Sequence, residues 1–303
     1  MMIKQIRTVC CTIVFLGLQL LACCHADLNA FGDSLSDVGN FSIVTGGALP
    51  PAPLYFNGRF SNGPVWTEYL AKAMDEPTPL PSLMGGTNYA FNGARAAGAS
   101  PYGTPDLGTQ VDSYLLANGG EADPDDIFVI WAGANDIFFG ATSGETNFIP
   151  AAVQAIAGSI RKLYQAGARN IVVLDLPLLG QTPFFNSVPP VSSALNSATT
   201  AFNSLLAAQL HSLRSELRRS RIADVQISRL FQAITRYPRL FGLRNVVDSA
   251  TLFDPDFGLG YALAPNVDPS RYLFWDSVHP TTQGHKIIAA YAFVDIKFHC
   301  RKR

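Results

Sequence analysis

Charged residues are scarce in this sequence. Of its 303 residues, 15% are Asp, Glu, Lys or Arg, while 48% are hydrophobic. The 22 basic and 23 acidic side chains nearly cancel, and the basic tail at residues 301–303 is too short to attract a polyanion, so we expect no nucleic-acid partner. So much apolar surface is also unlike a disordered chain. The composition predicts a well-buried globular protein.

Long hydrophobic runs are also rare, and the clearest one lies at the N-terminus. Lys4 and Arg7 precede a charge-free stretch, residues 8–24, that is rich in Val, Ile, Leu and Phe. This layout is typical of a secretory signal peptide. The stretch is short for a membrane span, so an uncleaved anchor is the minor alternative. We expect residues 1–26 to be a signal peptide and residues 27–303 to form one domain.

Two cleavage sites compete at the end of this segment. Residues 20–23 (LLAC) resemble a bacterial lipobox, which would leave a lipid on Cys23, whereas residues 24–26 (CHA) suit ordinary signal peptidase. An apolar run begins at Leu28, and a lipid on Cys23 would leave four residues of about 3.3 Å each between membrane and core. We therefore favour cleavage after Ala26 and a secreted or periplasmic protein, with lipoprotein anchoring as the alternative.

Cysteine is nearly absent from the expected mature chain. Four of the five cysteines precede Ala26, which leaves Cys300 alone and excludes an internal disulfide. Cleavage also leaves 20 basic and 23 acidic side chains, a net charge of −3. His, Cys and carboxylate residues do not cluster with the spacing of metal ligands. We expect neither a metal nor an organic cofactor.

Short apolar runs alternate with segments of helical period along the rest of the chain. This alternation is typical of parallel strands joined by crossover helices, so it predicts an α/β fold with a mainly parallel central sheet. No repeat or low-complexity linker divides the chain. The expected strands are residues 28–31, 88–91, 127–131, 171–176 and 224–227. The expected helices are residues 65–74, 107–117, 151–166 and 192–220.

Ser34 follows the first expected strand, at a position where an open parallel sheet binds ligands. A serine at a strand-to-helix turn presents its hydroxyl to solvent and offers its own backbone N–H to a developing oxyanion. Attack on an acyl carbon also requires a base. A Gly-Asp-Ser-Leu string by itself is weak evidence, because it is often only a turn.

Four histidines follow Ala26, and one of them has the surroundings that a base needs. His279 stands three residues after Asp276, so the carboxylate can fold back onto the imidazole and fix its tautomer. His211 falls on the polar face of a helix, His285 within a helical pattern and His299 in the tail. We interpret these three as structural or solvated.

Five sequence blocks in this order resemble the GDSL, or SGNH, hydrolases, and in detail their bacterial branch of phospholipase, lecithinase and haemolysin-like enzymes. The blocks span nearly the whole expected mature chain. They are residues 31–40 (FGDSLSDVGN), 58–66 (GRFSNGPVW), 86–94 (GTNYAFNGA), 131–136 (WAGAND) and 275–280 (WDSVHP). The resemblance implies a single-domain, flavodoxin-like three-layer α/β/α fold, the SGNH hydrolase fold.

The resemblance also implies the roles of five residues. Ser34 would be the nucleophile, His279 the base and Asp276 its orienting carboxylate, while Gly93 and Asn135 would complete the oxyanion hole with the Ser34 N–H. Gly93 lets a backbone N–H approach the substrate because it lacks a Cβ, and the Asn135 amide supplies a donor. Neighbouring polar residues are expected to bond turns and cap helices. They are Asp33, Asp37, Asn40 and Asp136, and Asp175 is interpreted in the same way.

The substrate is less determined by the sequence than the chemistry. Ile137, Phe138 and Phe139 follow Asn135, and Phe184 with Phe185 follows the fourth expected strand; either group could line an acyl pocket or simply pack in the core. The family branch suggests lysophospholipids or medium-chain acyl esters, with transient contact at a membrane surface. A short-chain, choline-type or carbohydrate acetyl esterase, the last favoured by an aromatic platform, and a lipid acyltransferase are alternatives. An exported binding protein without turnover is the alternative outside enzymes.

Overall fold

The computed structural model describes residues 26–255 and 258–299, and the expected signal peptide, Cys23 and Cys300 lie outside them. Four parallel strands in the order β1-β2-β3-β4 form its main sheet. The strands are β1 (Leu28–Gly32), β2 (Ile127–Trp131), β3 (Asn170–Leu174) and β4 (Arg221–Val225). Every residue of the first three strands is buried, as expected for a parallel sheet covered on both faces.

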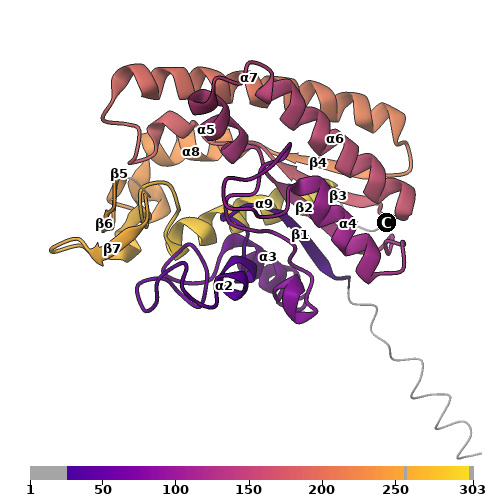
Figure 1. Cartoon of the computed structure of the whole chain (residues 1–303), viewed down its shortest axis with the longest axis horizontal. Helices are drawn as coiled ribbons and strands as arrows, with labels where there is room; N and C mark the ends of the chain where they lie inside the picture. The colour runs from indigo at the N-terminus through magenta and orange to yellow at the C-terminus, as the bar shows by residue number, and fades with distance from the viewer. Residues whose placement is uncertain (1–25, 256–257, 300–303) are drawn as a thin grey trace, which may run out of the picture.

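Helices cover both faces of this sheet and give three layers (Figure 1). On one face α4, α6 and α7 pack side by side, and on the other α3 packs against α9. The helices are α2 (Asn40–Val44), α3 (Trp66–Met74), α4 (Leu107–Ala117), α5 (Ala134–Ser143), α6 (Phe148–Ala166), α7 (Pro189–Glu216), α8 (Ile227–Arg236) and α9 (Thr282–His299). The expected α/β/α architecture is confirmed.

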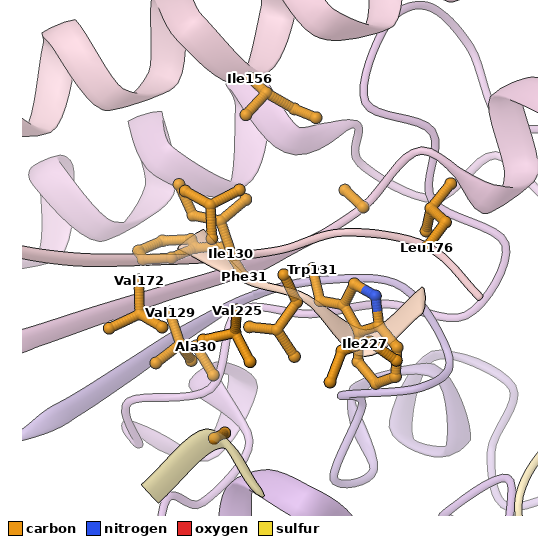
Figure 2. Close-up of a cluster of buried hydrophobic side chains, with 14 of the residues drawn as sticks. Ala30, Phe31, Val129, Ile130, Trp131, Ile156, Val172, Leu176, Val225 and Ile227 are labelled. Carbon is orange, nitrogen blue, oxygen red and sulfur yellow. The ribbon is translucent and has the colours of Figure 1, made fainter. Parts of the chain in front are cut away.

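Side chains of alternating direction on the strands build the core of these layers. Figure 2 shows Phe31 and Ile130 on the sheet face nearer Ile156 of α6, and Ala30 and Val129 on the opposite face. All five are at most 1% exposed. Among the described residues, no helix is both long and apolar enough to cross a membrane.

Three of the expected elements differ most from the structure, while others differ only at their ends, such as the expected helix 151–166, which begins at Phe148. Residues 88–91 are not a sheet strand: only Asn88 forms an isolated bridge with Ala30, although Tyr89 N–H still bonds the Ala30 carbonyl. Residues 221–225 form β4, and α8 begins at Ile227, so the expected strand 224–227 was placed too late. The long helix α7 begins at Pro189, whose fixed φ suits a first turn, and ends at Glu216.

A smaller unit of short strands lies beside the main sheet, at the left of Figure 1. It pairs β5 (Asn245–Ser249) with β8 (Tyr272–Phe274), and β6 (Thr251–Phe253) with β7 (Gly260–Leu263). Tyr55, Ala250 and Trp275 form a separate small core here. This unit carries the chain from β8 into the segment that contains Asp276 and His279.

Candidate active site

Ser34 lies in the turn that directly follows β1. The carbonyl of Asp33 accepts hydrogen bonds from the backbone N–H groups of Ser36 and Asp37, each at 3.0 Å, which close one tight turn around Ser34. Gly32 makes the exit from β1 possible, since its φ is +145° and a Cβ there would lie 2.0 Å from the Trp131 carbonyl oxygen. Ser34 is 8% exposed, so only a small part of its surface reaches solvent.

His279 and Asp276 meet Ser34 from the other end of the chain. The Nε2 atom of His279 lies 2.9 Å from Ser34 Oγ, although the two residues are 245 positions apart. The Nδ1 atom of His279 lies 2.8 Å from Asp276 Oδ2 and 2.9 Å from Oδ1. With Nδ1–H donating to the carboxylate, Nε2 is left as the acceptor for the serine proton. The geometry suits proton transfer from the serine to the imidazole.

Asp276 is fully buried and is held by several donors. Its Oδ1 atom accepts hydrogen bonds from the backbone N–H groups of Val278 at 3.0 Å and His279 at 2.8 Å. Its Oδ2 atom accepts a hydrogen bond from the Tyr55 hydroxyl at 2.5 Å. Sequence reasoning missed Tyr55, because no spacing pattern connects residues 221 positions apart.

Gly93 lies on a loop next to Ser34, and Asn135 lies in the first turn of α5, just after β2. Gly93 has a φ of +69°, and a Cβ there would fall 2.2 Å from the Tyr102 ring, so only glycine fits without movement. The Asn135 side-chain amide donates to the Ala94 carbonyl at 3.0 Å and lies 3.4 Å from Asp33 Oδ2. The second contact is long and weak, so this N–H can turn to a substrate oxygen. The structure therefore places an amide donor beside both glycine loop and serine turn.

Buried carboxylates hold these loops together, as expected for turn and cap residues. Asp37 accepts hydrogen bonds from the N–H groups of Gly39, Asn40, Phe41 and Asn92 at 2.7–3.1 Å. Asp136 accepts hydrogen bonds from Ala96 and Ala97 at 2.7 and 3.0 Å. Burial raises the pKa of both carboxyls, that of Asp37 to about 6.

Asp33 is the titratable group nearest to Ser34 in sequence. It is 2% exposed, and its Oδ1 atom accepts a hydrogen bond from the Leu35 N–H at 3.0 Å. Burial raises the pKa of Asp33 to about 7, while this hydrogen bond and the charge of His279 act in the opposite direction. The charge of His279 thus reaches the buried carboxyl of Asp33.

The three residues proposed to line an acyl pocket have different surroundings. Ile137 is 0% exposed and belongs to the main core, so it offers no surface to a substrate. The Phe139 ring covers the guanidinium of Arg95, at 4.5 Å. Phe138 packs on an aromatic residue outside its helix, Phe185, with ring centroids 5.3 Å apart. Ile137 is therefore a core residue, and the lining of an acyl pocket by Phe138 and Phe139 stays a prediction.

The remaining histidines are separate from this cluster. His285 is completely buried, accepts a hydrogen bond from the Trp66 N–H at 3.3 Å, and has its pKa lowered by burial to about 3. His211 is exposed on α7, and the side chain of His299 is outside the described part of the structure. In that described part, no group of three or more His, Cys, Asp or Glu residues could hold a metal ion.

Comparison with known proteins places the chain in a family. The GDSL-like lipase/acylhydrolase family matches residues 28–292. An uncharacterized protein in the trpE-trpG intergenic region of Pseudomonas putida is 30% identical over 89% of this chain and 48% of its own length. The chain thus spans about half of that relative. A phosphatidylcholine-sterol acyltransferase of Aeromonas hydrophila is 28% identical over 88% of this chain and 90% of its own.

A solved structure of similar outline is a catalytic mutant of an acetylxylan esterase from Geobacillus stearothermophilus. It is 15% identical, covers 92% of this chain and 97% of its own, and has a TM-score of 0.49. The family match extends over most of the described residues and includes Ser34, Gly93, Asn135, Asp276 and His279. The chain therefore belongs to the GDSL-like lipase/acylhydrolase family.

Proposed function

We propose that the chain is an exported serine ester hydrolase that cleaves lysophospholipids or medium-chain lipid esters through Ser34, His279 and Asp276. The observation that carries this proposal is the continuous contact from Ser34 Oγ to His279 Nε2, at 2.9 Å, and from His279 Nδ1 to Asp276 Oδ2, at 2.8 Å. A nucleophile, a base and an orienting carboxylate in this order form the acyl-transfer arrangement that recurs on unrelated folds.

In the first half of the reaction, Ser34 Oγ attacks the ester carbonyl carbon as its proton passes to His279 Nε2. The carbonyl π electrons move onto oxygen, and the N–H groups of Ser34 and Gly93 and the Asn135 amide stabilise the resulting oxyanion. His279 then returns the proton to the leaving alcohol as the C–O bond breaks. The product is an acyl ester of Ser34.

Water releases the acyl group in the second half. His279 takes a proton from water, the hydroxide attacks the Ser34 ester, and the proton returns to Ser34 Oγ when the carboxylic acid leaves. Asp276 stays ionised and stabilises the imidazolium in both halves. None of these steps requires a metal or organic cofactor.

An aromatic row beside the site supports a long acyl group. The row consists of Phe138, Phe185, Phe184 and Phe253, and each side chain is half-buried. Phe138 stacks on Phe185, Phe185 meets Phe184 edge-on at 4.8 Å, and Phe184 lies 6.1 Å from Phe253. Three separate segments therefore contribute to one apolar strip.

The row is attached both to α5, which carries Asn135, and to the segment that carries Asp276 and His279. Phe138 follows Asn135 by three residues on α5, which places both side chains on one side of the helix. The backbone N–H of Phe184 donates to the carbonyl of Ser277 at 3.0 Å, within the segment that holds Asp276 and His279. An acyl chain extending from Ser34 along the row would bury apolar surface on phenylalanine alone.

An aromatic surface by itself would also suit a sugar ester, but the composition of this row favours a lipid. Sugars are recognised by hydrogen bonds as well as by aromatic faces, whereas the four rings carry neither a hydroxyl nor an N–H and pack largely against one another. The short-chain, choline-type and acetyl esterases remain the alternative function. Each of them would use the same Ser34 chemistry with a smaller acyl group.

Acyl transfer is a second candidate, because one relative is named a phosphatidylcholine-sterol acyltransferase. The same acyl ester of Ser34 would pass to an alcohol in place of water, with His279 removing the alcohol proton. Transient contact with a lipid surface would bring such an acceptor to the site. Export to the secreted or periplasmic space rests on Lys4, Arg7 and the apolar stretch at residues 8–24.

The test compares residues 27–303 with the Ser34→Ala variant on p-nitrophenyl esters of increasing chain length and on lysophosphatidylcholine, with and without a sterol acceptor. We expect hydrolysis that peaks at medium or long chains and is lost in Ser34→Ala. Equal activity of both proteins would overturn the proposed mechanism. If hydrolysis is fastest with the acetyl ester, a short-chain esterase becomes the favoured function. If a sterol ester is formed, an acyltransferase becomes the favoured function.

A further inference from the structure

Tyr55 connects the proposed catalytic carboxylate to a distant part of the chain. It belongs to the loop between α2 and α3, is 1% exposed, and places its hydroxyl 2.5 Å from Asp276 Oδ2. The sequence blocks and family resemblance assign no role to it. The hydroxyl is the only polar group of the Tyr55 side chain, and it contacts the orienting carboxylate. Tyr55 is therefore well placed to influence the reaction.

The direction of this hydrogen bond follows from a third group. The backbone N–H of Gly260, at the start of β7, donates to the Tyr55 hydroxyl oxygen at 2.7 Å. A backbone N–H can only donate and a hydroxyl has one proton, so the Tyr55 proton is free to point at Asp276. An ionised carboxylate can only accept. Gly260, Tyr55, Asp276, His279 and Ser34 thus form one continuous hydrogen-bonded chain.

Tyr55 is the donor to Asp276 that comes from outside its own loop. The N–H groups of Val278 and His279 and the His279 ring belong to the same short segment as Asp276 and move with it. Tyr55 is separated from Asp276 by 221 residues and is fixed independently. Tyr55 therefore fixes the position of the Asp276 carboxylate relative to the rest of the protein.

Ring contacts keep the Tyr55 hydroxyl in place. The Tyr55 ring meets Trp275 edge-on at 6.3 Å and Phe60 at 6.2 Å. Phe60 in turn lies 5.1 Å from the His279 ring. Both neighbours of the tyrosine therefore also border Asp276 or His279, so displacement of its ring would disturb them together.

We propose that Tyr55 is a positioning residue that holds Asp276 in the orientation facing His279 and takes part of the carboxylate charge. The proposal rests on the proposed function of Ser34 and His279. Without the hydroxyl, Asp276 would be less well oriented, which slows proton transfer. Its undivided negative charge would also hold a proton on His279 more strongly, which moves the acidic limb of activity to higher pH.

Other titratable groups that act on His279 are present on neighbouring elements. Asp33, after β1, and His285, on α9, both interact electrostatically with His279, and Asp136 acts on Asp33. A change at Tyr55 leaves these three groups in place. A shift of the acidic limb is therefore attributable to the bond between Tyr55 and Asp276.

The first test is the Tyr55→Phe variant, compared with Tyr114→Phe as a matched control. Tyr114 is also buried, at 3% exposure, but its ring packs against Phe31 and Phe128 in the main core. We expect Tyr55→Phe to lower kcat about ten- to hundredfold at unchanged KM, the range for one lost hydrogen bond to a charged group. Its acidic limb moves to higher pH, while the profile of Tyr114→Phe matches wild type.

A second variant keeps the ring and hydroxyl, in case Tyr55→Phe does not fold. Incorporation of 3-fluorotyrosine at position 55 makes the phenol a stronger donor, which should take more of the Asp276 charge. The acidic limb is then expected at lower pH than in wild type, the opposite direction to Tyr55→Phe. A merely structural tyrosine would produce neither shift.

The outcomes separate this proposal from the proposed function. If Ser34→Ala is inactive but both position-55 variants keep the wild-type pH profile and kcat, the role of Tyr55 is overturned and the serine mechanism stands. If Ser34→Ala retains activity, the proposed function fails and the role of Tyr55 fails with it. Opposite shifts of the acidic limb in the two variants, with inactive Ser34→Ala, support both.

Discussion

The carboxylate of Asp37 accepts a hydrogen bond from the backbone N–H of Asn92 at 3.0 Å, which joins the loop carrying Ser34 to the loop carrying Gly93. The same carboxylate bonds the first N–H groups of α2. One buried side chain therefore sets the distance between the proposed nucleophile and a proposed oxyanion donor. The preorganisation of such donors is commonly a large part of catalysis by acyl-transfer enzymes.

Asp37→Ala should destabilise the protein strongly. It leaves four backbone N–H groups without their acceptor, and each unpaired buried group costs about 1–3 kcal/mol when water cannot replace the partner. We expect the free energy of unfolding, measured in urea, to fall by at least about 3 kcal/mol. Asp37→Asn retains one acceptor oxygen and should lose less. Equal stability of Asp37→Ala and wild type would show that hydrogen bonds to water replace the four hydrogen bonds to Asp37.

Asn135→Asp should show whether Asn135 contributes to the proposed oxyanion hole through its N–H donor or through the size of its side chain. The substitution preserves the shape of the side chain but exchanges its N–H donor for an acceptor. We expect kcat to fall about 10²- to 10³-fold with KM little changed, the usual effect of losing one oxyanion donor. Steady-state kinetics on a medium-chain ester measures both constants. A fall confined to KM would assign Asn135 to substrate binding alone.

Phe138→Ala should alter the preference for acyl chain length. Removal of this ring takes apolar surface from the aromatic row, so esters of long acids lose burial while acetyl esters do not. We expect kcat/KM for long-chain esters to fall about tenfold or more, with little change for the acetate. Tyr237→Ala removes an exposed aromatic ring outside the row and serves as the control. A uniform fall over all chain lengths would contradict an acyl-binding role.

Asp175→Asn should change the pH dependence of stability with a defined sign. Asp175 accepts hydrogen bonds from the N–H and hydroxyl of Ser228, and burial raises its pKa to about 6. An unfolded Asp titrates near ~3.9. The folded protein therefore binds this proton more tightly, and the stability it contributes is present below about pH 4 and lost as pH rises through about 6.

Urea unfolding of both proteins between about pH 4.5 and pH 7 checks this sign. Because asparagine does not titrate, the free energy of unfolding of wild type minus that of Asp175→Asn should fall as pH rises. A difference that grows with pH would mean that burial does not favour the protonated form of Asp175. A constant difference would mean that its pKa is alike in folded and unfolded chains.

The sequence predicted the sheet well where strands are short, continuous apolar runs. Residues 28–31 and 127–131 coincide with β1 and β2 because parallel strands covered on both faces bury every residue. Residues 89–91 are also apolar, yet a run of this kind cannot reveal that only one bridge, at Asn88, forms beside β1. Hydrophobic pattern reports burial, and pairing depends on the chain geometry around it.

The proposed site was predicted as far as its motifs extend. The spacing of Asp276 and His279 makes their contact a local event, so sequence could anticipate it. Tyr55 and the partnership of Phe138 with Phe185 depend on how distant loops fold onto one another. Ile137 was expected to line an acyl pocket but lies in the core. The sequence could not show this, because the orientation of α5 decides which residue after Asn135 faces the core.

Covalent labelling by a fluorophosphonate, followed by mass spectrometry of peptides, tests most directly whether Ser34 is the activated nucleophile. Such reagents mimic the tetrahedral state and react with a serine whose proton a neighbouring base removes. We predict one adduct, on the peptide containing Ser34, with loss of ester hydrolysis in proportion and greatly slowed labelling in His279→Ala. Complete inactivation with the adduct on another residue, or labelling of Ser34 at an unchanged rate in His279→Ala, would contradict the proposed mechanism.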